Sequence, residues 1–126
     1  MSRRHDQMSP RPLRVGESLR HEIAGMLMRG EVHDPRLEGL NVTVSEVRVS
    51  PDLRNATVFV AELGREASNE TLALLNHAGP FMAGKAARAL HLKYAPHLHF
   101  ARDESFAEAQ RIETLIARAR KDHPHG

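Results

Sequence analysis

The 126-residue chain has no cysteine and no tryptophan, and only 4% of its residues are aromatic. The lack of cysteine excludes disulfides, thiol catalysis and cysteine-ligated metal sites. No apolar run is long enough to span a bilayer, and residues 1–12 lack the hydrophobic segment of a secretion signal. We therefore expect a soluble cytoplasmic protein with one domain and a modest, mainly aliphatic core.

Acidic residues are missing from one long stretch, residues 78–102 (AGPFMAGKAARALHLKYAPHLHFAR). The whole chain has 18 Lys and Arg against 16 Asp and Glu, so its basic excess is concentrated here. The lysines and arginines of this stretch are Lys85, Arg88, Lys93 and Arg102. An acid-free block on ordered secondary structure is typical of a surface that meets phosphates, although a solvated basic face has the same composition.

The spacing of apolar residues predicts an α+β fold that begins with a helix. Apolar side chains recur on one helical face from Leu13, and Gly30 is placed to end that helix. A turn-rich connector follows at residues 32–40. The remaining order is two strands, two helices joined by a kink, a third strand and a last helix.

Alternating valines predict the first two strands as an antiparallel pair. Between residues 42 and 49 the alternation changes phase near Ser45–Glu46, which indicates a bulge. The Ser50-Pro51-Asp52 segment is a turn signal, and alternation resumes at residues 56–61. One face of this pair should be covered by helices.

The kink is predicted at Ala78-Gly79-Pro80. Ser68 can cap a helix that runs toward His77. Gly79 then permits an unusual backbone, and Pro80 is tolerated as the first residue of a second helix that extends to about Leu90.

The C-terminal part predicts one more strand and one more helix. The strand covers His97–Ala101, and the directions of its Leu98 and Phe100 side chains stay open. Ser105 and Glu108 have the spacing of a capping box, which starts the last helix. One side of that helix is apolar and carries Phe106, Ala109, Ile112, Leu115 and Ile116.

Both ends of the chain are basic and polar. We expect a flexible arm at residues 1–11, a globular domain at 12–118 and a flexible tail at 119–126. Arg11 and Arg14 could add contacts to an anionic partner, although short basic termini are often inert.

Residues 79–86 nearly match a phosphate-binding loop of nucleotide hydrolases. Two features count against that function. Ala86 stands where a hydroxyl should bind magnesium, and the segment follows a helical pattern and not a buried strand. Nucleotide hydrolysis is therefore a disfavoured alternative.

Histidines raise the alternative of a metal site. His97 and His99 would face the same side of a strand, with His91 nearby. Two imidazoles without an obvious third ligand or supporting carboxylates make a poor site, so we expect no metal. No arrangement of residues argues for catalysis.

Several segments resemble ribosome-binding factor A, a family of bacterial small-subunit assembly factors. They are RPLRVGESLRHEIAGML, HDPRLEGLNVTVSEVRVSPDLRNATVFVAEL, HLKYAPHLHFARDES and RIETLI, and together they span Arg11 to Ile116. The most specific parts are the turns at residues 34–37 and 49–53 and the segment 96–105.

The resemblance implies a type II KH-like domain, with a three-stranded sheet and helices on one face. In this family a helix–kink–helix with the pattern Ala-Xaa-Gly replaces the usual Gly-Xaa-Xaa-Gly clamp. Ala78-Gly79-Pro80 occupies that place here, with proline where the family pattern has its glycine.

The family's role, and so the expected role here, is non-catalytic binding of the 30S subunit or its precursor. It supports late maturation and 5′-end processing of 16S rRNA, including growth in the cold, and the resemblance implies no cofactor and a monomer. From the residues we predict that Lys85, Arg88, Lys93 and Arg102 contact RNA, with Arg11 and Arg14 as auxiliaries. With few aromatics, recognition should depend on phosphates and RNA shape. The alternative is a protein-interaction module whose sheet edge and basic surface bind a protein partner.

Overall fold

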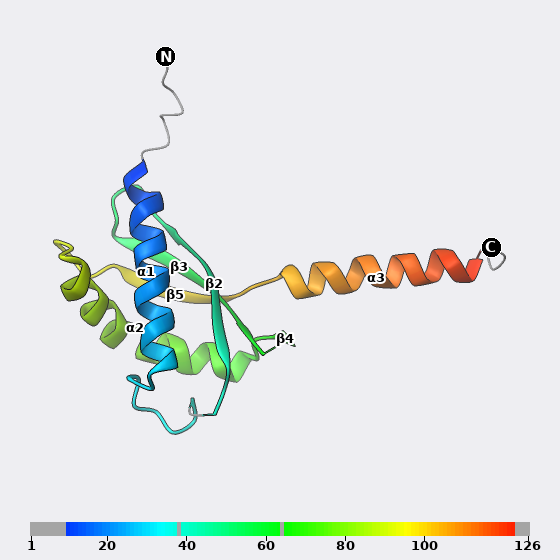
Figure 1. The fold of residues 1–126 in the computed structure, drawn as a ribbon, viewed down its shortest axis with the longest axis horizontal. Coiled ribbons are helices and arrows are strands. Elements are labelled where there is room, and N and C mark those ends of the chain that lie inside the picture. The colour runs from blue at the N-terminus through cyan, green and yellow to red at the C-terminus, as the bar shows by residue number, and fades with distance from the viewer. Residues whose placement is uncertain (1–9, 38, 64, 123–126) are drawn as a thin grey trace, which may run out of the picture.

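The computed structural model describes residues 10–37, 39–63 and 65–122 (Figure 1). Its elements are α1 (Pro10–Met28), β2 (Val42–Val49), β3 (Asn55–Glu62), β4 (Arg65–Glu66), α2 (Asn69–Leu90), β5 (His97–Arg102) and α3 (Ser105–Asp122). This order confirms the predicted α+β fold. None of the helices in these ranges is long and apolar enough to cross a membrane.

Helix α1 packs its predicted apolar face into the core. The fully buried side chains on that face are Leu19, Ile23 and Met26. The helix begins at Pro10, before the predicted start at Leu13. Prolines are tolerated in a first helical turn, because the N–H groups of that turn have no partner within the helix and the missing N–H of proline costs no hydrogen bond. Arg11 is therefore helical, while residues 1–9 of the predicted arm lie outside the described residues. Gly30 follows the helix with a positive φ of 70°, as its predicted role in ending the helix requires.

The sheet contains the three predicted strands. β2 and β3 are antiparallel, and their register shifts between Val44 and Glu46, which confirms the bulge. β5 lies parallel to β3 on its other side. A short fourth strand, β4, pairs with Ala61 and Glu62 at the end of β3. The sequence did not predict β4 because its two residues are both exposed and are too few to show alternation.

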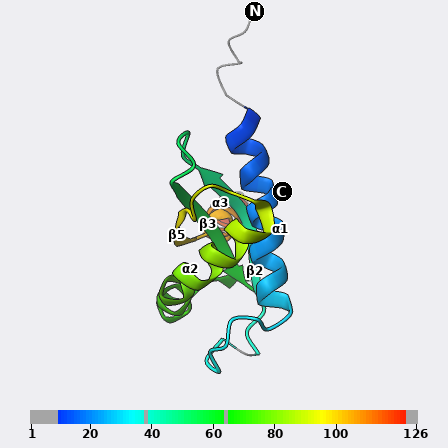
Figure 2. The same ribbon diagram turned by 90° about the vertical axis from the view of Figure 1, so that its left-hand side faces the viewer.

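Helices α1 and α2 lie on the same side of the sheet (Figure 2). Leu98 and Phe100 are both buried in the core, so the open question about their directions is answered: both face the helices. His97 and His99 alternate with them and are exposed on the other face. The core is mainly aliphatic, as the composition predicts, with Phe100 as its largest fully buried side chain.

Helix α2 is one continuous helix, and the predicted break at Ala78-Gly79-Pro80 is absent. Pro80 lies inside the helix and is not the first residue of a second one. A proline there removes one helical N–H and crowds the preceding turn, so it bends a helix that packing otherwise maintains. The ribbon of α2 changes direction part-way along its length (Figure 1). Gly79 is buried against β5, where an added Cβ would lie 3.5 Å from the Leu98 carbonyl oxygen.

The start of α2 is tied to the β3–β4 hairpin by a buried carboxylate. Ser68 caps the helix as predicted, and its hydroxyl accepts a hydrogen bond from the Thr71 N–H. The Glu62 side chain accepts from the Ser68 N–H at 3.0 Å and from Arg65 at 2.7 Å. The Ser68 N–H, then the Thr71 hydroxyl and Arg65, lower the pKa of Glu62 to about 2.

The outer edge of β5 is closed at its centre. The Asn76 side chain, on α2, accepts from the Phe100 N–H at 2.8 Å and donates to the Phe100 carbonyl at 3.2 Å. Both groups point away from β3. The His97 N–H donates to the Arg54 carbonyl, just before β3, and the Asp103 N–H donates to the Val60 carbonyl of β3. Since every second residue of a strand bonds to the same neighbour, the Phe100 groups face the opposite side. An incoming strand cannot pair with β5 at Phe100 unless Asn76 leaves, which counts against sheet-edge recognition there.

Helix α3 extends away from the domain (Figure 1). On its predicted apolar side Ile112, Leu115 and Ile116 are 46–55% exposed, and the Phe106 side chain lies outside what the structure describes. Its start also differs from the predicted capping box. The Glu108 N–H donates to the Glu104 carbonyl at 3.0 Å, and Asp103 accepts from the Ser105 N–H at 2.9 Å. Ser105 is thus already inside the helix, and Asp103 takes the capping role.

Candidate nucleic-acid interface

Two segments that are distant in the sequence meet at one end of the sheet. Arg54 follows the turn after β2, and Tyr94 lies in the loop between α2 and β5. The guanidinium carbon of Arg54 lies 4.1 Å from the centroid of the Tyr94 ring, and Lys93 Nζ lies 5.5 Å from it. The Tyr94 side chain remains 49% exposed. Sequence reasoning missed Arg54 and Tyr94, because no local pattern indicates that these segments are neighbours.

The backbone holds both segments in place. The Arg54 N–H donates to Asp52, and the Arg54 carbonyl accepts from the His97 N–H at 2.8 Å. Leu53 and His91 are the non-glycine residues with positive φ in the described ranges, at 62° and 57°. Such a backbone costs of the order of 1 kcal/mol for a side-chain-bearing residue. The fold therefore maintains an unfavourable local conformation on each side of the contact.

Two of the predicted RNA contacts, Lys85 and Arg88, lie in the C-terminal half of α2. Arg88 is exposed and makes no ion pair within the described part of the chain. Lys85 Nζ lies 2.9 Å from Glu31, which also pairs with Arg29 at 2.5 Å. The hydrogen bond from Arg29, and then that from Lys85, lower the pKa of Glu31 to about 2. Glu31 thus stays ionised and its negative charge offsets part of the positive charge of Lys85. The positive charge of Arg88 is not offset by an ion pair to any described residue.

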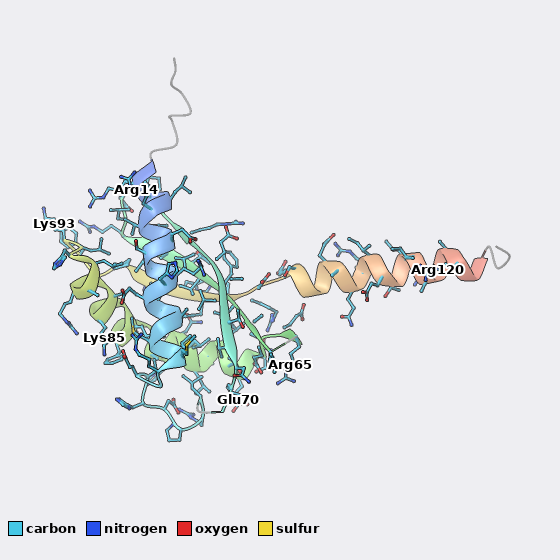
Figure 3. The ribbon with its side chains drawn as sticks, in the orientation of Figure 1. Arg14, Arg65, Glu70, Lys85, Lys93 and Arg120 are labelled. Atoms are coloured by element: carbon cyan, nitrogen blue, oxygen red, sulfur yellow. The ribbon has the colours of Figure 1, made fainter. Side chains whose placement is uncertain are left out.

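The first turns of α1 add positive charge at the same end. Figure 3 shows Arg14 and Lys93 at one end of the domain, with Arg65 and Glu70 at the other. Arg11 lies one turn before Arg14, and the first turn of α1 holds no acidic residue. The amino end of a helix carries a partial positive charge, which adds to that of the side chains.

Four cations define what we call the basic end: Arg14, Arg54, Arg88 and Lys93. None of them makes an ion pair among the residues that the structure describes. Arginines elsewhere do, in the pairs Arg20–Glu17, Arg36–Asp34, Arg48–Glu46 and Arg65–Glu62. Asp52 is the acid of the adjoining turn, and its carboxylate is bound by the Ser50 hydroxyl at 2.7 Å. The basic end therefore carries positive charge that is not offset by an ion pair to any described residue.

Arg102, the remaining predicted RNA contact, lies elsewhere. Its guanidinium donates to the Ala67 carbonyl at 2.8 Å and to the Asn69 side chain at 2.6 Å, at the start of α2. With a rise of 1.5 Å per residue, Asn69 and Arg88 are separated by about 28 Å along the helix. The structure thus brings Arg88, Lys93, Arg14 and Arg11 toward one end and leaves Arg102 near the other. Lys85 lies apart from Arg11 and Arg14, because its partner Glu31 follows the opposite end of α1.

The segment that resembles a phosphate loop, residues 79–86, lies entirely within α2. Its backbone N–H groups are used by the helix, apart from Pro80, which has none, so they cannot surround a phosphate. Lys85 is paired with Glu31. The structure thus adds a reason to disfavour nucleotide hydrolysis.

In the part of the chain that the structure describes, the histidines do not gather with acidic side chains as a metal centre would require. His97 and His99 share the exposed face of β5, as their spacing predicted. No group of three His, Asp or Glu side chains with metal-binding geometry occurs among the residues searched, which are the described ones.

Comparison with known proteins gives a consistent result. The family described as ribosome-binding factor A matches residues 11–116. A ribosome-binding factor A from Rhodopseudomonas palustris (strain HaA2) is 54% identical over 108 residues, which cover 86% of this chain and 80% of that protein. The crystal structure of ribosome-binding factor A from Thermus thermophilus superposes with a TM-score of 0.58 at 26% identity, covering 71% of this chain and 93% of that one. A homology model of the Thermus thermophilus factor, fitted into the cryo-EM map of a 30S complex, has a TM-score of 0.54 at 27% identity and covers 68% and 87%. With its α+β fold of the KH-like type, the chain belongs to the ribosome-binding factor A family.

Proposed function

We propose that this protein is a non-catalytic ribosome assembly factor that binds the 30S subunit or its precursor. The observation that carries the proposal is the basic end, where ordered cations from α1, α2 and two loops are not offset by ion pairs within the described residues. Family membership and the similar factor fitted into a 30S map support the same partner. Within this role we propose support of late 16S rRNA maturation, including 5′-end processing and growth at low temperature.

Binding should depend mainly on phosphates. Side chains that neutralise RNA phosphates release counterions, so affinity falls steeply as salt rises. We propose that Arg88, Lys93 and Arg14 make these contacts, with Arg11 beside Arg14, Arg54 as an addition, and Lys85 one helical turn before Arg88 on α2. Arg102 is left out, because its guanidinium already bonds to Ala67 and Asn69.

Sedimentation with purified 30S subunits and with precursor particles, at several salt concentrations, tests the proposal. Wild-type protein should co-sediment at about 50 mM salt and lose affinity steeply by about 200 mM. The double variant Arg88→Gln/Lys93→Gln should bind more weakly, and its salt slope should be smaller by about two. A matched control is Arg36→Gln/Arg48→Gln, which removes the same charge from exposed ion pairs elsewhere.

Absence of co-sedimentation at low salt, with folded protein, would refute the 30S partner. Equal losses in the two double variants would show that net charge alone, and not the basic end, governs binding. Co-sedimentation that is insensitive to salt would instead favour the protein-interaction alternative.

A further inference from the structure

Tyr94 is an exposed aromatic side chain on a fixed backbone. Its loop begins with the cap of α2, where the Leu92 N–H donates to the Ala87 carbonyl at 2.9 Å. It ends at Pro96, which is fully buried, and the next residue, His97, is bonded to Arg54. Since both ends of the loop are held, the half-exposed ring has a defined place at the basic end.

The Arg54 guanidinium lies against the ring without burying it. At 4.1 Å from the ring centroid, Arg54 is within cation–π distance, and Lys93 Nζ lies 5.5 Å away. Almost half of the side-chain surface still faces solvent. An aromatic ring and a guanidinium plane are the two protein groups on which unpaired RNA bases stack. Phosphates flanking such a base would meet Lys93 and Arg88.

The geometry points to Tyr94 as a stacking site for one unpaired nucleotide of RNA, with Arg54 orienting the ring and Lys93 and Arg88 binding the adjacent phosphates. This inference rests on the proposed function and adds a ligand class to it. Bases inside a duplex are already stacked and present only their edges, so the site distinguishes single-stranded RNA from a helix. Contact with phosphates alone would not make that distinction.

A spectroscopic test follows from the composition. Tyr94 is the single tyrosine of a chain without tryptophan, so its fluorescence reports on this site alone. The probes are a mixed-sequence RNA of about 12 nucleotides, single-stranded, and the same strand in a duplex. Binding is followed independently through a dye on the RNA. We expect bound single strand to quench Tyr94 emission and bound duplex to leave it nearly unchanged. Equal quenching by both, or none by bound single strand, overturns the inference.

Variants test the same site by affinity. Tyr94→Leu should weaken single-strand binding about 10-fold and leave its salt slope unchanged, whereas Tyr94→Phe should retain most of the affinity. Phe81→Leu is the matched control, because Phe81 is 48% exposed and lies on α2 outside the basic end. Urea unfolding establishes that each variant is folded, and the quenching test on wild type applies even if Tyr94→Leu is not. A folded Tyr94→Leu protein with wild-type affinity contradicts the inference.

Failure of the inference and failure of the proposed function give different results. If wild type co-sediments with 30S particles and Tyr94→Leu does so equally well, the stacking site is refuted and the 30S partner is supported. If wild type does not co-sediment but single-stranded RNA quenches Tyr94 emission, the 30S partner is refuted and the single-strand site is supported. If Tyr94→Leu weakens 30S binding but not RNA binding, the ring contacts a ribosomal protein, and the RNA inference is overturned.

Discussion

Replacing Gly16 by alanine should destabilise the protein, although alanine is the better helix former. Gly16 lies within α1 and is buried against β2. A Cβ atom added there would lie 2.7 Å from the Val47 carbonyl oxygen. A real Cβ keeps more than 3.0 Å from such an atom, so either the helix or the strand must move. Because Val47 is paired with Val58 across the sheet, we expect α1 to shift outward.

The magnitude follows from two opposing effects. Forcing an extra carbon into a packed contact costs about 1–3 kcal/mol. Replacing glycine inside a helix returns about 0.5–1 kcal/mol. We therefore expect Gly16→Ala to lower the free energy of unfolding by about 1–2 kcal/mol.

Gly84→Ala is the matched control, since it makes the same substitution inside α2. A Cβ at Gly84 would meet only the Arg88 guanidinium, at an ordinary 3.7 Å. This variant should be more stable than wild type by about 0.5–1 kcal/mol. Urea unfolding with a common m-value gives both differences. If Gly16→Ala is as stable as wild type or more so, the close approach of α1 to β2 is contradicted.

Three further predictions concern polar contacts. The pKa of Glu62 is about 2, against an ordinary value of 4.5, so its stabilising contribution should be complete above about pH 4.5 and be lost as the pH falls toward 2. Glu62→Gln should therefore flatten the pH dependence of the free energy of unfolding, measured with urea, over that window. An unchanged pH dependence would contradict this. Asn76→Ala should lower the free energy of unfolding by about 1–3 kcal/mol, because both Phe100 backbone groups lose their partner. Asn76→Asp, which keeps only the acceptor for the Phe100 N–H, should have a stability between those of wild type and Asn76→Ala. If Asn76→Ala is as stable as wild type, the edge contact is refuted. Glu31→Gln should release Lys85 and increase the salt slope of 30S binding by up to about one with little effect on stability; an unchanged slope would show that Lys85 does not meet a phosphate.

The sequence predicted what depends on local pattern. The face of α1, the bulge in β2 and the Ser68 cap each arise from residues within a few positions of one another, and the structure confirms all three. The break at Pro80 was wrong, because its cost of about 3 kcal/mol is local whereas the packing that offsets it is not. The buried Met82 and Ala86 hold the following turns against the core.

The composition of the basic end could be predicted only in part. Charge counting found Arg88 and Lys93, but it could not separate them from Arg102, whose acceptors come from other segments. It also missed Arg54, which reaches Tyr94 only because β3 and β5 are neighbours in the sheet. The apolar stripe of α3 likewise predicted a helix, but a stripe does not say whether the domain will cover it.

The position of Pro80 has a consequence for how this surface could diversify. A covalent ring at one exposed position bends α2, while the buried side chains on either side of it hold the helix against the core. A substitution there would change the bend, and with it the turns that lead to Arg88, without replacing any buried side chain. A protein with another residue at this position would thus present the proposed RNA contacts at a different angle, with the same core side chains.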